Sequence, residues 1–476
     1  MNPESSEDKT IVRIRALIWL YFWLLLVEGA LRKWVFTELS NPLLIVRDPV
    51  VFAIYLLSFR LRIFARNPWV MVLVVIGALC TLATCVQLWP YLPPSKIAAV
   101  TGYGIHADFF HLPLIFVMAR VLRFEDVKKF GWWTLVLLIP ITVLLVAQFR
   151  ASPDAFVNRT AGGEGEMMMA AMGKVRTAGP FSFVTGVVAY FALATGYLVW
   201  GVLKPQVYKN SLLAVAGMAL VIGIVVSGSR SVVGACAVVV GCLLPVTILR
   251  PDVVNRFGRV LLAVVILGFV VSQTPIFKEG LKVLSTRFSE VAEATEQSVA
   301  GGMVSRLFSG FGDAYFVFGK SPFLGYGLGI GTNAGAKFLT GHSMFILSEG
   351  EWSRVFLESG PVLGLAYLLW RLGLVFRIGL LSLKAVRRAN LLPLLIFSSS
   401  FLPMISGQFG QPTILGFTIF AAGLALAAIK EEESSVSGSP APAPSAKKVA
   451  RGRSVYAEQL HGTSALPGQS NGSVDR

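Results

Sequence analysis

The apolar residues of this 476-residue chain are gathered into blocks of about 20, which polar connections of varied length separate. An α-helix needs about 20 apolar residues to cross the hydrocarbon core of a bilayer. The pattern therefore predicts an all-α, polytopic membrane protein with about twelve transmembrane helices. The expected spans are residues 14–31, 43–59, 69–89, 97–119, 131–149, 181–203, 211–227, 231–249, 259–273, 352–376, 391–406 and 413–429.

Composition supports this class of protein and excludes several others. Charged residues make up 14% of the chain and hydrophobic residues 55%, whereas soluble proteins carry about 25% charged residues. A soluble enzyme, a nucleic-acid-binding protein and a disulfide-stapled secreted module are therefore excluded. The cysteines all lie inside apolar blocks, where they are expected to pack as small core residues. They are Cys80, Cys85, Cys236 and Cys242.

The basic residues, whose excess gives a net charge of +16, are concentrated in alternate connections. Membrane helices orient with their Lys- and Arg-rich short loops toward the cytoplasm. Arg13 and Arg15 precede the first apolar block, and no small-x-small cleavage site follows it, so the first span is expected to remain uncleaved. Every short loop on the side of the N-terminus is basic, which predicts that both termini are cytoplasmic.

Two segments on the expected outer side, residues 150–180 and 274–351, are longer than ordinary connections. The second has apolar residues at helical spacing and is expected to form an extracytoplasmic helical cap between spans nine and ten. The chain ends in a segment rich in Glu, Ser, Pro and Gly without an apolar period. The predicted organisation is a membrane domain over residues 1–430 and a disordered cytoplasmic tail over residues 431–476.

Several ionisable residues lie within apolar blocks, where a charge is costly unless it has a partner or a function. Arg47-Asp48 in the second span is compatible with an ion pair to a neighbouring helix and with a functional role, and both remain open. Glu28 and Arg32 are four residues apart and are expected to pair along one helix. The motif His106-Ala-Asp108-x-x-His111 contains metal-binding side chains. Its offsets of two and five do not share one face of an α-helix, so no metal is expected.

The candidate phosphate-binding groups are arginines. Arg230 lies in the turn Ser227-Gly228-Ser229-Arg230, where small residues leave backbone amides accessible and the guanidinium fits a phosphate. The alternative is an interfacial arginine that reaches lipid head groups. Arg306, in the expected cap, is a second candidate.

A glycine-rich stretch follows Lys320 in the cap, with Gly325, Gly327 and Gly329 at every second position. This spacing permits unusual backbone conformations and a close approach of a ligand, or a flexible hinge. It does not match a nucleotide-binding loop, because no Gly-Lys-Ser/Thr sequence ends it.

The tenth span opens with acidic residues and one arginine, namely Glu349, Glu351, Arg354 and Glu358. Arg354 and Glu358 share a helix face, so an ordinary pair is one interpretation and a site is the other. His342, just upstream, is the one cap residue that titrates near neutrality when unperturbed.

These motifs, in this order, resemble those of the O-antigen ligase and O-antigen polymerase family of bacterial envelope enzymes. The motifs extend over about residues 170–375 and are Arg176-Thr-Ala-Gly179-Pro-Phe181, Ser227-Gly-Ser-Arg230, Arg306, Ser321-Pro322-x-x-Gly325-x-Gly327-x-Gly329 and Glu358-Ser-Gly360-Pro-Val-Leu-Gly364. The chain departs from the family in one respect. The His-Asn pair that often precedes the glutamate motif is missing near Glu349.

The resemblance implies a multi-pass glycosyltransferase of the bacterial inner membrane that works on its outer face without a metal or another cofactor. It implies transfer of a saccharide from a polyprenyl-diphosphate donor to a glycan or lipid acceptor. The implied partners are this donor, membrane lipid and other polysaccharide-assembly proteins, with no nucleic acid. The missing His-Asn pair favours an exopolysaccharide-type polymerase over a ligase.

The resemblance also implies roles for individual residues. Arg230 and Arg306 would bind the diphosphate, with Arg176 as a third candidate, because fixed guanidinium groups stabilise the charge of the leaving group. The catalytic candidates for moving the acceptor's proton are His342, Glu349, Glu351 and Glu358. The sugar-binding candidates are Arg354, Lys320, Gly325, Gly327 and Gly329.

A transporter or flippase for lipid-linked saccharides is the rival function, because it would account for many spans and for the intramembrane Arg47-Asp48. The absence of an internal repeat and of paired broken helices argues against it. A scaffold without catalysis is a third possibility, in which no single arginine would matter.

Overall fold

The described part of the chain is built from helices and contains no strand. The computed structural model describes residues 3–64, 67–163, 168–249, 254–295, 310–342 and 344–437. In chain order the elements are α1 (Pro3–Ala30), η1 (Leu31–Val35), η2 (Pro42–Ile45), α2 (Asp48–Arg60), α3 (Pro68–Leu88), α4 (Pro94–Ile105), η3 (His106–Phe110), α5 (Leu114–Val121), α6 (Phe124–Arg150), η4 (Phe156–Asn158), η5 (Ala161–Gly163), α7 (Val184–Leu203), α8 (Asn210–Val226), α9 (Arg230–Gly241), α10 (Leu243–Leu249), α11 (Val254–Ser272), α12 (Pro275–Thr295), α14 (Asn333–Thr340), α15 (Glu351–Arg387), α16 (Leu392–Ser406) and α17 (Pro412–Ser437).

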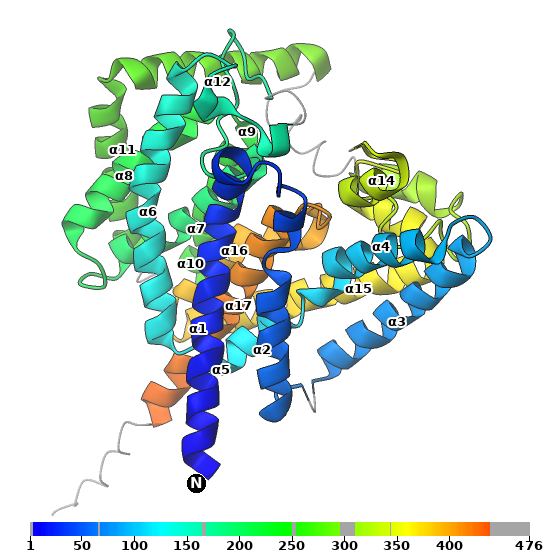
Figure 1. Ribbon diagram of the computed structural model, residues 1–476. Helices are drawn as coiled ribbons and strands as arrows, with labels where there is room; N and C mark the ends of the chain where they lie inside the picture. The colour runs from blue at the N-terminus through cyan, green and yellow to red at the C-terminus, as the bar shows by residue number, and fades with distance from the viewer. Residues whose placement is uncertain are drawn as a thin grey trace, which may run out of the picture. The chain divides into compact units, whose positions relative to one another are not determined.

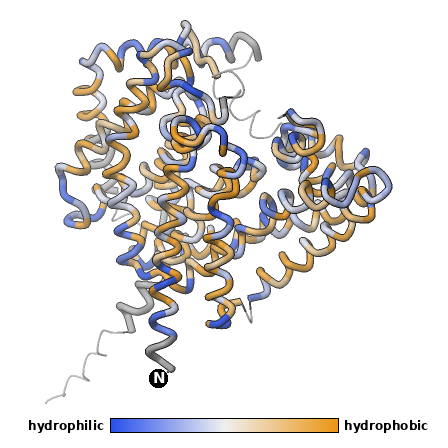
Figure 2. Tube along the Cα trace, viewed as in Figure 1, coloured by the Kyte–Doolittle hydropathy of each residue, from blue (hydrophilic) through white to orange (hydrophobic). Residues whose placement is uncertain are grey.

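The described helices include nine that are long and apolar enough to cross a membrane. Figure 2 shows the apolar residues along their length. The chain is therefore a polytopic α-helical membrane protein. Two shorter apolar helices, α8 and α16, coincide with two more of the expected spans. The total of twelve remains a prediction.

The most buried helices are α7 and α17, which lie inside the bundle formed by the others. Phe420 of α17 packs against Phe22 of α1 and Phe130 of α6, with ring centroids 5.4 Å and 5.1 Å apart. Aromatic contacts of this kind contribute packing beyond simple burial of area. This cluster holds the N-terminal helix against the C-terminal one.

Helix α16 connects two groups of helices (Figure 1). It packs on α7, which contacts α6, α8 and α9, and it also packs on α15, which contacts α3. Helix α14 packs on α4. The site described below is built from α15, the segment before α14 and the connection between α16 and α17.

Helix α15 is broken at Gly360, and its first two turns fold back on the remainder. Gly360 has φ +75° and ψ 171°, and Pro361 begins the second segment. Glu351 and Arg371 are 20 residues apart, yet the Arg371 Nη1 atom lies 2.7 Å from Glu351 Oε1. A straight helix would separate them by about 30 Å. The expected span over 352–376 is therefore wrong in its first part, and only the segment after Gly360 is a continuous helix.

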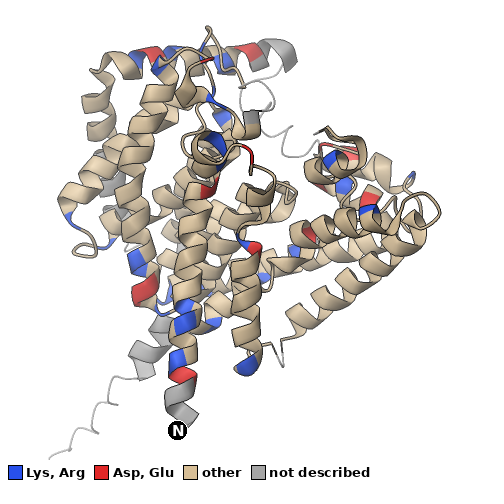
Figure 3. Cartoon of the chain, in the orientation of Figure 1, with Lys and Arg blue, Asp and Glu red and all other residues tan. Residues whose placement is uncertain are grey.

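The described residues of the expected cap segment contain three helices joined by turns and loops. The helices are α12, a helix over residues 310–318 and α14. Phe311 and Phe318 contact Trp352 and Phe356 of α15, with ring centroids 4.5 Å and 5.2 Å apart. Charged residues line α12 (Figure 3). The location of the cap segment on the outer membrane face remains a prediction.

The chain divides into two compact units, Met1–Glu432 and Glu433–Arg476. Helix α17 continues to Ser437. Residues 431–437 of the expected tail therefore belong to α17. Residues 438–476 lie outside the described part of the chain.

Candidate functional site

The first turns of α15 carry a buried row of charged side chains. Glu351, Arg354 and Glu358 recur at spacings of three and four, so they share one face of the helix. Their side chains are almost fully buried, and Glu358 is completely buried. The i,i+4 pair predicted between Arg354 and Glu358 is confirmed by an Nη1–Oε2 distance of 2.8 Å.

Arg354 lies at the centre of this row and binds three carboxylates. Its Nη2 atom lies 2.7 Å from Asp108 Oδ1, and its Nε atom lies 3.0 Å from Glu351 Oε2. Arg371 binds the other oxygen of Glu351. Buried charges require this kind of pairing because their desolvation costs several kcal/mol per ion.

Arg371 belongs to the segment of α15 that follows Gly360. Its side chain is 1% exposed. Its guanidinium also donates to the carbonyl of Met404 at 3.1 Å and stacks over the Phe409 ring at 3.9 Å. The fold-back at Gly360, which the sequence did not reveal, places Arg371 beside Glu351.

The glycine-rich loop packs on α15 through its backbone. The amides of Gly329 and Gly331 donate to the two oxygens of Glu358, at 3.0 Å and 2.7 Å. A Cβ atom at Gly325 would lie 2.2 Å from the carbonyl oxygen of Glu358, and the backbone at Gly325 has φ +74°. Glycine is therefore required for the close approach of two main chains, and the hydrogen bonds argue against a free hinge.

A pocket opens beside this network, with a volume of about 270 Å³ that includes the solvent at its mouth. Its polar lining comes from Asn333, Glu349, Glu351, Arg354, Gln408 and Gln411. Gln408 donates to the carbonyl of Glu349 at 2.6 Å, and Gln411 is bonded to Gln408 and to Thr185 of α7. Amide and carboxylate groups of this kind suit a ligand rich in hydroxyls.

His342 and Lys320 do not line this pocket. His342 is exposed in the turn after α14, and its backbone amide donates to Thr340 Oγ1 at 3.3 Å. Lys320 is exposed in the turn after the helix over residues 310–318. Arg306 lies outside the described residues.

Arg176 and Arg230 lie in a second neighbourhood, against α12. Thr177 Oγ1 donates to the carbonyl of Val226 at 3.1 Å, so the two arginine-bearing motifs are adjacent. Arg230 begins α9 and donates to the carbonyl of Arg287 at 2.7 Å. Arg176 and Arg230 thus belong to this arginine cluster and do not line the α15 pocket.

A single stretch of chain connects the two neighbourhoods. Thr177 contacts the turn before α9, whereas Thr185 Oγ1 lies 3.2 Å from Gln411 Oε1 at the pocket. Eight residues of fully extended chain span at most about 29 Å. This length sets an upper limit on the separation of Thr177 from Thr185 and of the segments that they contact.

Sequence reasoning missed several residues of the site, namely Asp108, Asn333, Arg371, Gln408 and Gln411. The run Gln408-Phe409-Gly410-Gln411 follows an apolar block directly and was a usable signal. Asp108 was considered only as a metal ligand. Its partner Arg354 is distant in sequence, so no local pattern pointed to it.

Comparisons with models of known protein families and with curated protein sequences find no match for this chain.

Proposed function

We propose that this protein is a membrane glycosyltransferase of the polysaccharide polymerase or ligase type. The pocket beside α15 is the observation that carries the proposal. It combines two carboxylates, an arginine and three amide side chains, which are groups that hydrogen-bond the hydroxyls of a saccharide. Arg354 and Gly331 of its lining bind Glu358, which belongs to a motif that resembles the O-antigen ligase and polymerase family.

Glu349 is the best placed base for the acceptor. Glu351 is bound by Arg354 and Arg371, and both oxygens of Glu358 are occupied. Glu349 lines the pocket with an exposed side chain. In the proposed step, the acceptor hydroxyl loses its proton to Glu349 and its oxygen attacks the anomeric carbon of the donor. The bond from that carbon to the diphosphate oxygen breaks, and the electron pair leaves with the polyprenyl diphosphate.

The arginine cluster would bind that leaving group. Arg176 and Arg230 are carried by adjacent segments, and guanidinium groups form bidentate contacts with phosphate. Fixed positive charge lowers the barrier where negative charge develops, so the transfer itself requires no metal. The donor would be a polyprenyl-diphosphate-linked saccharide held in the bilayer on the outer face of a bacterial inner membrane.

The test is a transfer assay on the purified protein in nanodiscs, with a polyprenyl-diphosphate oligosaccharide and no nucleotide. Release of polyprenyl diphosphate and the length of the glycan are followed together. We expect Arg230→Ala and Glu349→Gln to reduce release by about 10²–10³-fold. Arg377→Ala and Glu125→Gln change exposed residues of the same type and should retain wild-type release.

The products separate the remaining possibilities. A lengthening ladder indicates a polymerase, and release only in the presence of an added lipid or glycan acceptor indicates a ligase. Unchanged release in both Arg230→Ala and Glu349→Gln would contradict the proposed site. Movement of intact donor across a sealed bilayer without release would replace the transferase with the flippase.

A further inference from the structure

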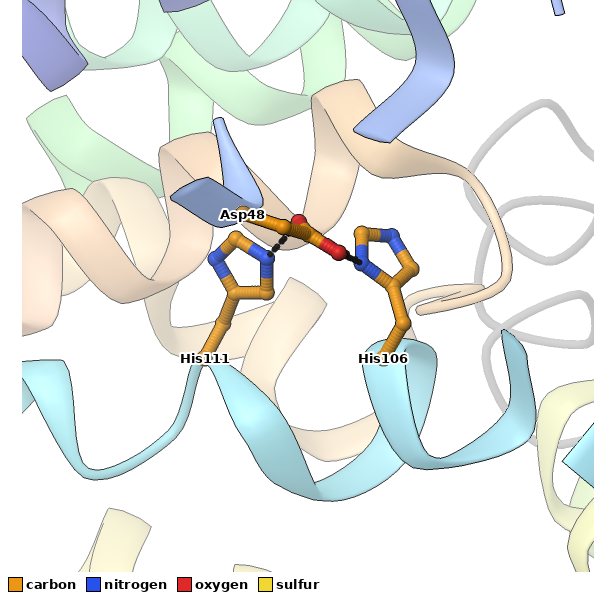
Figure 4. A group of neighbouring side chains, drawn as sticks. All are labelled: Asp48, His106 and His111. Atoms are coloured by element: carbon orange, nitrogen blue, oxygen red, sulfur yellow. Dashed lines mark hydrogen bonds and ion pairs between the residues drawn. The ribbon is translucent and has the colours of Figure 1, made fainter. Parts of the chain in front are cut away.

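A second cluster of ionisable side chains lies outside the pocket, at the junction of α2 and η3. Figure 4 shows two histidine rings directed at one carboxylate. His106 Nδ1 lies 2.8 Å from Asp48 Oδ2, and His111 Nε2 lies 2.9 Å from Asp48 Oδ1. Both histidines are buried, at 5% and 1% exposure. Buried nitrogen and oxygen atoms grouped in this way are the kind of set that can bind a metal ion.

The two histidines are brought together by a π-helical turn. Residues His106–Phe110 form the π-helix η3. In an α-helix, two residues five apart point about 140° away from each other. A π-turn closes at the fifth residue, so His106 and His111 face the same side, with ring centroids 5.0 Å apart. The expectation that these residues share no helix face is therefore wrong for this pair. Asp108 points the other way, to Arg354.

We propose that Asp48, His106 and His111 bind a divalent transition-metal ion, for which Zn²⁺ is the best match. One ligand atom from each residue lies within 4.8 Å of the others. Two imidazole nitrogens, one carboxylate oxygen and a water complete a tetrahedral zinc site. The Asp48 side chain is 22% exposed, which leaves a path for the water. Hard cations such as Mg²⁺ prefer oxygen ligands and fit this set poorly.

The carboxylate and each ring need only a small adjustment to coordinate the ion. His106 Nδ1 and His111 Nε2 each lie 2.9 Å from Asp48 Oδ1, which is the separation of a hydrogen bond. Bonds of about 2.0–2.1 Å at tetrahedral angles place ligand atoms about 3.3 Å apart. A shift of about half an ångström between the carboxylate and each ring therefore opens the site. Asp48 is the first residue of α2, where such a movement leaves the helical hydrogen bonds intact.

A supporting hydrogen bond orients one of the rings. The Tyr21 hydroxyl lies 3.4 Å from His111 Nδ1, the nitrogen that faces away from Asp48. Metal-bound histidines usually make such a bond with their second nitrogen. Arg47 donates to the same hydroxyl at 3.1 Å, and Glu28 lies 3.4 Å from the Arg47 Nε atom. Glu28 thereby offsets the positive charge nearest to the proposed ion.

The proposed ion is held by residues that do not line the saccharide pocket. It would join α2 to η3, and η3 supplies Asp108 to the ion-pair network of α15. This inference is independent of the proposed glycosyltransferase function. Metal binding would hold regardless of the substrate.

The test measures metal bound to the purified full-length protein. Protein in nanodiscs is incubated with ZnCl₂, desalted and analysed by elemental mass spectrometry, and Co²⁺ is used separately as a spectroscopic probe. We expect about one zinc per chain and a tetrahedral cobalt spectrum in the wild type. His106→Ala and His111→Ala should lose both signals. His342→Ala, which alters an exposed histidine, should retain them.

Two milder variants guard against misfolding. Asp48→Asn keeps the size of the side chain and removes its charge, and Tyr21→Phe removes only the supporting hydroxyl. Each should weaken zinc affinity, by about 10–100-fold for Tyr21→Phe, while the protein elutes as the wild type does in size-exclusion chromatography. No zinc above background in the wild type, or equal zinc in all variants, would overturn the proposal.

Discussion

At the scale of single residues, the main feature is a network of buried ion pairs. The network around α15 holds three buried carboxylates, Asp108, Glu351 and Glu358, against the guanidinium groups of Arg354 and Arg371. The carboxylates outnumber the guanidinium groups by one. The amides of the glycine-rich loop supply further donors by binding both oxygens of Glu358.

Arg371 should therefore matter for stability although it lies outside the pocket. Arg371→Met keeps much of the length of the side chain but leaves Glu351 with Arg354 as its remaining cation. We expect the free energy of unfolding to fall by about 3 kcal/mol. Removing one partner of a buried ion pair leaves the other charge desolvated and less well compensated. Denaturant unfolding in detergent micelles measures this loss. Arg377→Met is the matched control, because Arg377 is exposed on the same helix.

A second substitution distinguishes the contribution of the ion pair to stability from that of side-chain packing. Adding Glu351→Gln to Arg371→Met removes the uncompensated charge, so part of the lost stability should return. Equal stability of the Arg371→Met and Arg377→Met proteins would show that the buried pair is not required.

At the scale of elements, the break in α15 determines the site. A Cβ atom at Gly360 would lie 2.1 Å from the carbonyl oxygen of Phe323, and φ at Gly360 is +75°. Both features exclude larger residues at this position. The break lets Glu351 meet Arg371 and brings the acidic end of the helix to the pocket.

Gly360→Ala should consequently loosen the glycine-rich loop from α15. We expect lower thermal stability and faster cleavage by trypsin at Lys320, which lies close to Phe323 in sequence and is already exposed. Gly319→Ala is the control, because a Cβ atom there meets no atom within 4 Å. Equal cleavage rates in the two variants would mean that the close approach at Gly360 does not hold the loop.

The elements also show how far sequence reasoning reaches. Apolar blocks and i,i+4 spacing depend on local periodicity, so the helical, membrane-spanning class and the Arg354–Glu358 and Glu28–Arg32 pairs were predicted correctly. The π-turn at His106 and the fold-back at Gly360 were not. Each is a local departure of the backbone from α-helical geometry, and it changes the helix face on which the following residues lie. The periodicity of the sequence does not encode such a departure. The contact between Asp108 and Arg354 depends on both and joins residues 246 positions apart.

At the scale of the whole molecule, contacts between connecting segments agree with an alternating topology. Arg15 of α1 donates to the carbonyl of Val121, and both are expected on the cytoplasmic side. Lys33, at the other end of the first span, donates to the carbonyl of Gly179, and both are expected outside. These contacts show which ends of the spans lie together. The orientation of the bundle in the membrane rests on the positive-inside rule.

Cysteine accessibility in intact cells can determine that orientation. In a Cys85→Ser background, which removes an exposed native cysteine, Thr340→Cys lies at the end of α14 and Lys204→Cys follows α7, and both positions are exposed. A membrane-impermeant maleimide should label Thr340→Cys in intact cells and Lys204→Cys only after permeabilisation, because the loop that carries Lys204 is basic and the loop that carries Thr340 is the expected outer cap. The reverse pattern would place the α15 pocket in the cytoplasm. A lipid-linked donor presented on the outer face could not then reach the pocket, and the proposed transferase would need a cytoplasmic donor instead.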